Sequence, residues 1–524
     1  MLGDLRHAAD LLTRNARKYP DEVGLVDGLH RFTWWELNRR ANRCAHALRE
    51  MGVRQGDVIG LYLLNCYEYI TTLFGAAKIG AAVAGVNPRF MADELRHVLN
   101  DSRASIVMVD AERAGIVKTV MPDCRVLRRA ICTAPNSFGF DEYEAALAGE
   151  ADEEPMPERP IQEKDPLVII YTSGTTGHPK GAIWWHRGTI LNIFTFAHTI
   201  GLRYGMRIVL PGPLYSTGGT GMMLAAVFMA VTGIIVNFES RLVLETLLRE
   251  RADYINLVPA TINFLLNDPQ FSEYDLSLLK TILYAGSVMP ESLVHRALAS
   301  FACDFRQVFG MTETCCLGTV LEPWEHVVGG DSRWTKRLAS CGREMLNTHI
   351  RVVNEAGEDV KPNGEVGELI IKSDGNILGY LNNPEATAET VRDGWVYTGD
   401  LAIIDEDGFV YIVDRKKDMI VSGGTNIYPV EIENVLYSHP AILECAVFGV
   451  PDEKWGEAVK AAIVLRPGHS PSQEEIIELC KTRLASFKKP RLIEFVDSLP
   501  RNPAGKVLKR VLRDKHWAGR ERKV

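Results

Sequence analysis

The 524-residue sequence lacks several features that would assign a protein to a class at once. Its ten cysteines form no CxxC pair, so they indicate neither a disulfide framework nor a zinc site. Its net charge of -8 provides no overall attraction to nucleic acid or to an anionic membrane. The first 17 residues mix charged and apolar side chains, with no uninterrupted apolar stretch. That pattern argues against a secretory signal and predicts a cytoplasmic protein.

Charge is also missing from residues 208–238, a stretch long enough to cross a bilayer. Two prolines and five glycines interrupt it, however, which is unusual for a membrane helix. We predict instead a strand at 208–210, a helix near 222–231 and a strand at 234–238. A strand–helix–strand unit is apolar throughout when it is buried on both faces, so no membrane span is expected.

The remaining composition is that of a folded protein, with 46% hydrophobic and 24% charged residues, and the length predicts two or more domains. Thr33 and Glu36 have the spacing of a capping box at the start of a helix. Further along, predicted strands alternate with helices, which favours parallel sheets covered by helices. The strands are 58–63, 81–86 and 104–109, and the helices 67–78 and 92–100. Residues 150–164 are rich in acids and proline, so we predict an exposed connection there.

Beyond about residue 411 the pattern becomes that of a smaller α+β unit. We predict helices at 429–437 and 471–484 and strands at 442–450, 459–465 and 491–495. The charged segment 414–418 lies where a hinge between two cores would be expected. The fold class is therefore α/β, with a large N-terminal domain (1–414) of parallel-rich sheets packed with helices and a small, mobile α+β C-terminal domain (415–524).

The segment 171–181, YTSGTTGHPKG, directly follows an apolar strand at 167–170. Its small residues allow close approach of an anion, and its amides and hydroxyls can donate hydrogen bonds to it. Lys180 adds a positive charge. The spacing differs from the common GxxxxGK[ST] phosphate loop. We therefore predict a phosphate cradle of another type, formed by Thr172, Ser173, Gly174, Thr175, Thr176 and Gly177 with Lys180.

This segment resembles the phosphate-binding loop of the acyl-adenylate-forming superfamily, which includes acyl-CoA synthetases, luciferases and peptide-synthetase adenylation domains. Further segments match the superfamily in the same order, from about residue 10 to residue 510. They are YAGS (284–287), FGMTE (309–313), YTGDL (397–401), Asp414-Arg415, MIVSGGTN (419–426) and PRNPAGK (500–506). The segment 417–424 is more similar to the acyl-CoA synthetase branch than to peptide synthetases.

The resemblance implies an ATP site. Thr312 would contact the α-phosphate, and Glu313 would hold Mg²⁺, a cation that prefers carboxylate and phosphate oxygens. Asp400 would bind the ribose hydroxyls and Arg415 the ribose and phosphate region. The remaining nucleotide contacts would come from the turn Gly286-Ser287, which lies along adenine, and from Phe309, Gly310 and Met311.

The resemblance also implies two half-reactions, ATP-dependent formation of an acyl-AMP and transfer of the acyl group to coenzyme A. Lys506 would be the lysine that stabilises the charge that builds up during adenylation. The C-terminal domain would then rotate about Lys417. That rotation would bring Ser422, Gly423 and Gly424 to the pantetheine tunnel of coenzyme A.

Tyr215, Ser216, Gly218 and Met222 would line the acyl pocket, with Ser216 where many relatives have a histidine. An apolar lining favours a fatty, alicyclic or aromatic acid. One alternative is an enzyme that loads a carrier protein, although residues 213–219 lack the aspartate typical of amino-acid-activating members. A catalytically silent nucleotide-binding relative is another. The sequence leaves a homodimer open.

Overall fold

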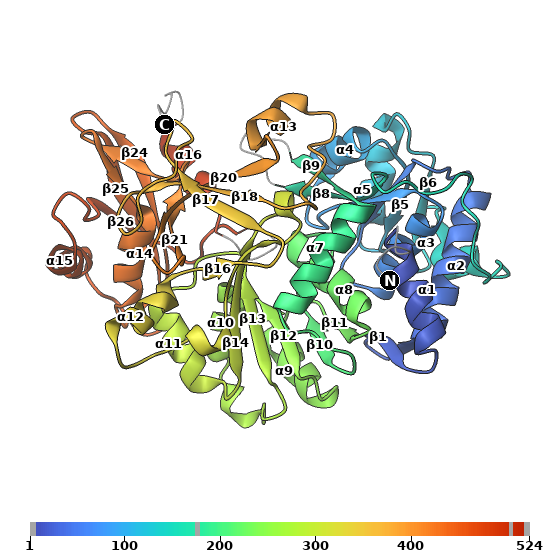
Figure 1. The fold of residues 1–524 in the computed structure, drawn as a ribbon. Coiled ribbons are helices and arrows are strands. Elements are labelled where there is room, and N and C mark those ends of the chain that lie inside the picture. Colours follow the sequence, from blue (N-terminus) through green and yellow to red (C-terminus); the bar gives the residue numbers. More distant parts are fainter. Residues whose placement is uncertain (1–6, 173–178, 502–506, 518–524) are drawn as a thin grey trace.

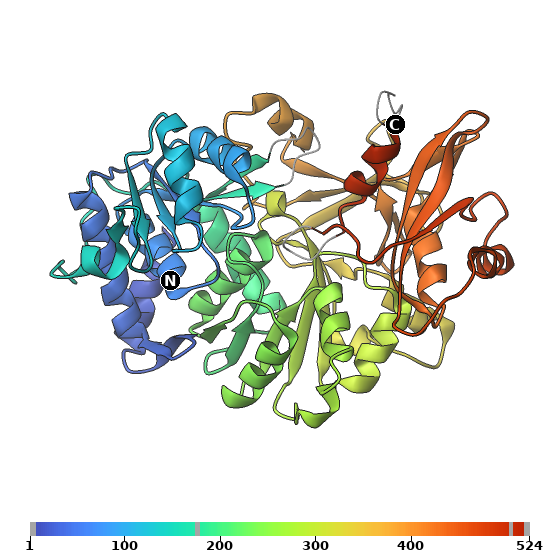
Figure 2. The same ribbon diagram turned by 180° about the vertical axis from the view of Figure 1, so that it is seen from behind.

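The computed structural model describes residues 7–172, 179–501 and 507–517. Helices pack on and between three sheets in the larger N-terminal part, and a fourth sheet belongs to the C-terminal part (Figures 1 and 2). The first sheet has nine strands, of which six neighbours, from β14 to β1, are parallel. In order across the sheet they are β16 (Arg343–Glu344), β15 (Gly318–Leu321), β14 (Asp304–Gly310), β13 (Thr281–Ala285), β12 (Tyr254–Leu257), β10 (Arg207–Leu210), β11 (Thr232–Ile235), β1 (Val23–Asp27) and β2 (His30–Thr33).

The second sheet has seven strands and is parallel except for its last pair. In order they are β7 (Asp141–Glu142), β6 (Arg129–Cys132), β5 (Ala104–Val109), β3 (Val58–Tyr62), β4 (Ala82–Gly85), β8 (Pro166–Thr172) and β9 (Lys180–Trp185). Helices α2 (Trp34–Glu50), α3 (Tyr67–Lys78) and α4 (Ala92–Asp101) surround this sheet (Figure 1). The predicted capping box is confirmed, because Thr33 and Glu36 exchange both hydrogen bonds at the start of α2. The predicted fold class is also confirmed.

The charge-free stretch folds as the predicted strand–helix–strand unit. The parallel neighbours β10 and β11 are joined by α8 (Thr217–Met229), which is buried over most of its length. The helix begins five residues earlier than predicted, because the Ser216 side chain caps it, and β11 begins and ends earlier than the predicted strand. Among the described residues, no helix is both long and apolar enough to cross a bilayer.

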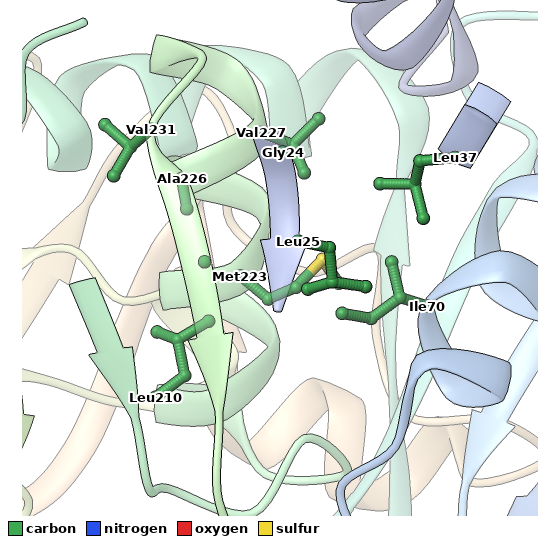
Figure 3. A pocket seen from close by; sticks show the side chains of 10 residues that line it. Gly24, Leu25, Leu37, Ile70, Leu210, Met223, Ala226, Val227 and Val231 are labelled. Carbon is green, nitrogen blue, oxygen red and sulfur yellow. The ribbon is translucent and has the colours of Figure 1, made fainter. Parts of the chain in front are cut away.

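A small cavity of about 10 Å³ lies beneath α8, between β1, β10 and β11 (Figure 3). Its lining is apolar and includes Leu25, Leu210 and Met223. A space of this size holds at most one water molecule, and its walls offer no side-chain partners for one. We interpret it as a packing void in the core and not as a ligand site.

The third and fourth sheets have five strands each. The third consists of β17 (His349–Val353), β18 (Gly367–Lys372), β20 (Trp395–Ile404), β19 (Val391–Arg392) and β21 (Val410–Arg415). The fourth consists of β23 (Thr425–Ile427), β22 (Ile420–Ser422), β25 (Gly456–Leu465), β24 (Ile442–Asp452) and β26 (Leu492–Phe495) and is accompanied by α14 (Pro429–Tyr437), α15 (Gln473–Arg483) and α16 (Lys509–Trp517). The chain passes between these sheets after Arg415 and before Ile420, so we retain 1–414 and 415–524 as the proposed domains.

The connection at 150–164 is more than the exposed segment that its composition predicts. Asp152 forms ion pairs with Arg39 and Arg43 of α2, and the carbonyl of Met156 accepts a hydrogen bond from Arg49 of the same helix. Glu154 lies 2.5 Å from the ammonium group of Lys78 at the end of α3. The acids that suggested a solvated loop instead hold the segment against α2 and α3.

The Lys78–Glu154 pair provides a test of this attachment. The Lys78 side chain is 3% exposed and Glu154 is 45% exposed, so removal of the carboxylate leaves a buried cation without its counter-charge. Because Glu154 itself is partly solvated, we expect Glu154→Gln to lower the free energy of unfolding by about 1–2 kcal/mol. Glu158→Gln, which breaks the exposed pair with Arg54, is the control and should cost less than about 0.5 kcal/mol in urea titrations. Equal effects would contradict the attachment.

Candidate active site

The predicted site residues follow strands that end at one edge of the first sheet. Strands β10, β12, β13 and β14 are parallel neighbours, so their carboxyl ends meet on the same side. Tyr215 and Ser216 lie in the segment after β10, Gly286 and Ser287 follow β13, and Thr312 and Glu313 follow β14. The carboxyl edge of a parallel sheet is where ligands of open α/β folds bind. The predicted acid, adenine and phosphate segments are therefore brought together.

The second sheet contributes to the same edge through Asn65, which follows β3. Its side-chain amide donates to the carbonyl of Gly212 at 2.9 Å, and its oxygen accepts the amide of Leu214 at 2.8 Å. Gly85, at the end of β4, is so close to this segment that an added Cβ would lie 3.1 Å from backbone atoms of Tyr215. The predicted acid segment is thus fixed between the two sheets. Nothing in the residue pattern marked Asn65 for this role.

Glu313 is buried and accepts a short hydrogen bond from the hydroxyl of Tyr380. Tyr380 also lies beside Lys180, whose ammonium nitrogen is 5.6 Å from the centre of its ring. Backbone contacts hold this arrangement, because Leu381 donates to the carbonyl of Gly181 at 2.8 Å. The structure therefore brings Lys180 to the ring and Glu313 to the hydroxyl of the same tyrosine, which the sequence analysis did not identify.

Burial raises the pKa of Glu313, and the hydrogen bond from Tyr380 and the charge of Arg415 oppose that rise. Among the described residues, no three histidine, cysteine or acidic side chains cluster as a complete protein-only metal site. A single carboxylate suits Mg²⁺, which commonly takes one or two protein carboxylates together with phosphate oxygens and water. Glu313 fits that role once a nucleotide supplies the remaining oxygens.

Thr312 joins the phosphate segment to the acid segment. Its hydroxyl is hydrogen-bonded to that of Thr217 at the start of α8, and its carbonyl accepts the indole N–H of Trp184 at 2.9 Å. The turn is unusually tight. Cys315 and Cys316 both adopt left-handed backbone conformations, and an added Cβ on Gly310 would lie 2.3 Å from the carbonyl oxygen of Cys316. Glycine at 310 is therefore required by packing.

The structure brings Asp400 and Arg415, two of the predicted nucleotide contacts, together. They are directly opposite each other on the antiparallel strands β20 and β21, and the guanidinium Nε lies 2.9 Å from a carboxylate oxygen. Asp400 is buried, whereas the arginine side chain is partly exposed. The two predicted adenine segments differ in exposure. Gly286, which has a positive φ of 90°, and Ser287 are exposed. In the second segment Phe309 and Met311 are half-buried, and Gly310 between them is exposed.

Ser216 has a structural role that its sequence position does not reveal. Its hydroxyl accepts the amide of Gly219 at 3.3 Å and donates to the carbonyl of Pro213 at 2.7 Å, so it caps α8. Tyr215 is buried and its hydroxyl has no partner among the described residues. Met222 is part of the core, while an added Cβ on Gly218 would meet no atom within 4 Å. Ser216 is thus engaged with the backbone.

Two predicted segments lie partly outside the described residues. In the phosphate segment, the undescribed residues include Ser173, Gly174, Thr175, Thr176 and Gly177. Thr172 and Lys180, on either side of them, are paired across the β8–β9 hairpin. Lys506 is also outside the described residues. The residues before and after its segment are joined, since Arg501 and Val507 form a β-bridge and Leu508 donates to the carbonyl of Pro500 at 2.8 Å.

The predicted hinge and coenzyme A segments lie at the start of the C-terminal part. The carbonyl of Lys417 accepts a hydrogen bond from Arg513 of α16 at 3.2 Å. Ser422 is opposite Thr425 in the β22–β23 hairpin, and Gly423 and Gly424 form its turn with positive φ values of 59° and 79°. A two-residue turn with both φ values positive favours glycine. Turn geometry is thus a sufficient reason for these glycines.

Comparison with known proteins assigns the family. A family model described as "AMP-binding enzyme" matches residues 12–381, and one described as "AMP-binding enzyme C-terminal domain" matches residues 431–506. Long-chain-fatty-acid–CoA ligase FadD13 of Mycobacterium tuberculosis is 36% identical over 489 residues, which are 93% of this chain and 94% of the relative. Feruloyl-CoA synthase of an Amycolatopsis species is 36% identical over 498 residues, 95% of this chain and 96% of the relative.

The solved structure of the anthranilate CoA ligase AuaEII in complex with anthranoyl-AMP superposes with a TM-score of 0.89, at 28% identity and 97% coverage of both chains. The chain belongs to the AMP-binding enzyme family. Within it, the similarity falls in the acyl-CoA synthetase branch of the acyl-adenylate-forming enzymes, as the sequence motifs implied.

Glu313 provides a test that separates catalysis from stability. Burial raises the pKa of Glu313 in the folded state, so its ionisation at pH 8 lowers the free energy of unfolding. Below the ordinary glutamate pKa the side chain is protonated in both the folded and the unfolded state, and this cost disappears. Glu313→Gln should therefore raise the unfolding temperature at pH 8, and the difference from wild type should shrink towards pH 5. The same variant should reduce Mg²⁺-dependent pyrophosphate release about 100-fold, since it loses the charge that is predicted to hold the metal. A destabilised variant with normal metal dependence would contradict this role.

Proposed function

We propose that this protein joins an apolar carboxylic acid to coenzyme A through an acyl-AMP intermediate, with release of pyrophosphate and AMP. The observation that carries the proposal is that Thr312-Glu313 and the predicted acid segment around Tyr215 meet at one edge of the first sheet. The Asp400–Arg415 pair of the third sheet lies near enough for both charges to act on Glu313. We further propose the nucleotide, acid and coenzyme A contacts named above as the functional residues. A cytoplasmic location and a homodimer both stay predictions.

In the first half-reaction the acid carboxylate attacks the α-phosphorus of ATP, the bond to the bridging oxygen breaks, and pyrophosphate leaves. The chain supplies position and charge, and no covalent enzyme intermediate is needed. We propose that Thr312 contacts the α-phosphate, that Lys180 offsets phosphate charge, and that Asp400 accepts hydrogen bonds from the ribose hydroxyls. Mg²⁺ held by Glu313 would supply further positive charge to the departing pyrophosphate.

In the second half-reaction the thiol of coenzyme A attacks the acyl carbon, and AMP leaves with the bonding electrons. The proposed coenzyme A residues must then face the acyl-AMP. In this structure Gly423 and Gly424 are exposed, and the amide of Gly423 donates to the carbonyl of Trp455, in the turn between β24 and β25, at 2.8 Å. We infer that the observed orientation of the C-terminal domain serves adenylation, and that rotation about Lys417 is required before thioester formation.

The acid is proposed to be apolar because the acid-binding segment contains no charged side chain and packs on the apolar α8. The two curated relatives are named for a long-chain fatty acid and for a feruloyl group, and the solved structure for anthranilate. These names include both alkyl and aromatic acids, and we propose that the substrate of this chain is an acid of one of these two kinds.

The direct test measures pyrophosphate and AMP release with octanoate, dodecanoate, palmitate, benzoate, anthranilate and ferulate. Each acid is assayed with ATP and Mg²⁺, with and without coenzyme A. We expect at least one acid to give pyrophosphate alone and a CoA thioester when the thiol is added. Turnover only with a phosphopantetheinylated carrier protein would favour the carrier-loading alternative. Absence of any AMP-linked product across this and a wider acid library would refute the proposed function.

Lys506 can be tested by separating the half-reactions. Lys506→Ala should slow adenylation about 100- to 1,000-fold, because a positive charge next to the reacting phosphate is removed. The same variant should still convert a supplied acyl-AMP to the thioester at nearly the wild-type rate. Lys515→Ala, in the exposed part of α16, is the matched control and should leave both steps unchanged. Equal loss of both steps in Lys506→Ala would contradict its assignment to adenylation.

A further inference from the structure

Asp414 is the last residue of the proposed N-terminal domain, yet its carboxylate is bound by the C-terminal domain. It is 3% exposed, and one of its oxygens accepts the amide of Val430 at 3.1 Å. Val430 is the second residue of α14, whose own preceding residue, Tyr428, makes no side-chain cap. A carboxylate at this position satisfies an otherwise unpaired amide and interacts favourably with the helix dipole. The cap of α14 therefore comes from the other side of the hinge.

Charged groups from α14 and α16 surround this carboxylate. Lys509 of α16 attracts Asp414, and its ammonium group also lies 2.8 Å from Glu433 of α14. Arg513, one turn further along α16, lies 3.4 Å from Asp418 and donates to the carbonyl of Lys417. Lys509 and Arg513 of α16 are thus directed at the hinge segment.

A second contact crosses between the domains at a separate place. The guanidinium of Arg466, directly after β25, donates to the side-chain oxygen of Asn267 at 3.2 Å. Asn267 follows α10 (Pro259–Leu266) in the N-terminal domain. Rotation about Lys417 would move Val430, Lys509 and Arg466 together and leave Asp414 and Asn267 behind. Both contacts are therefore specific to the observed orientation.

We propose that Asp414, by capping α14 across the hinge, is a positioning residue that holds the C-terminal domain in its adenylation orientation and is released when the domain rotates. The proposal rests on the two-orientation mechanism proposed above. The Lys509–Glu433 pair stays within the C-terminal domain, so α14 and α16 keep their mutual contact when the carboxylate is withdrawn. The contact with Asp414 favours one orientation without being needed for the domain to fold.

The test measures the two half-reactions separately at pH 8, where Asp414 is ionised because its pKa is raised by burial only to about 6. Whichever panel acid turns over fastest is used for adenylation, and its synthetic acyl-AMP for thioester formation. Asp414→Asn should lower the ratio of adenylation to thioester formation about 2- to 5-fold, because the carboxamide oxygen can still accept the Val430 amide but the charge that interacts with the helix dipole is lost. Arg466→Ala should lower it about twofold.

Glu431→Gln is the matched control. Glu431 is also in the first turn of α14, but it pairs with Lys488 of its own domain at 2.7 Å, so its loss should leave the ratio unchanged. Equal loss of both half-reactions in Asp414→Asn, or the same ratio as in Glu431→Gln, would overturn the proposal. If Asp414→Asn does not fold, Arg466→Ala decides, and an unchanged ratio in that variant counts against the proposal.

A readout without substrate separates this inference from the proposed function. Trypsin can cleave after Lys416, whose side chain is 55% exposed, once the hinge segment becomes accessible. Asp414→Asn should accelerate cleavage at 415–417 several-fold over wild type and over Glu431→Gln. Unchanged hinge cleavage would contradict the positioning role even if the enzyme proves active. Faster cleavage in a protein that activates no acid would support the positioning role of Asp414 and reject the proposed acyl-CoA ligase function.

Discussion

The shared direction of six parallel strands is the constraint on which the rest of the structure depends. Because β10, β12, β13 and β14 run the same way, segments more than 70 residues apart in sequence end at one edge. The second sheet adds β3 and β4 to the same region through Asn65 and Gly85. Helices cover both faces of these sheets, so the strand ends are the place where polar groups can remain accessible.

At that edge, and in the neighbouring third sheet, the polar groups of the predicted site are fixed by contacts that cross elements. Glu313 is bound by Tyr380, Thr312 by Thr217, and Asp400 by Arg415. Each partner comes from a different strand, turn or helix, so each functional side chain is held before any ligand arrives. Such preorganisation is what electrostatic catalysis of adenylation requires, since little covalent chemistry is left to the protein. The mobile element is proposed to be the C-terminal domain.

Two positions show how a correct motif can carry an incomplete physical explanation. Ser216 is predicted to line the acyl pocket, and its hydroxyl caps α8. Gly423 and Gly424 are predicted to reach the pantetheine tunnel of coenzyme A, and the hairpin turn already requires positive φ values there. Neither observation removes the proposed roles. They show that local backbone demands act on the same residues as the proposed function.

Local periodicity and capping rules were sufficient to predict α2, α3, the strand–helix–strand unit around α8 and most of the C-terminal elements, because those signals act within a few residues. The ordered motifs also identified the family, and they predict which groups bind ATP. Tertiary structure alone decided that Tyr380 supports Glu313, that Glu154 binds Lys78, and that Asp414 caps a helix of the other domain. These contacts join residues from 16 to 76 positions apart, and no local pattern encodes which partner a buried charge will meet.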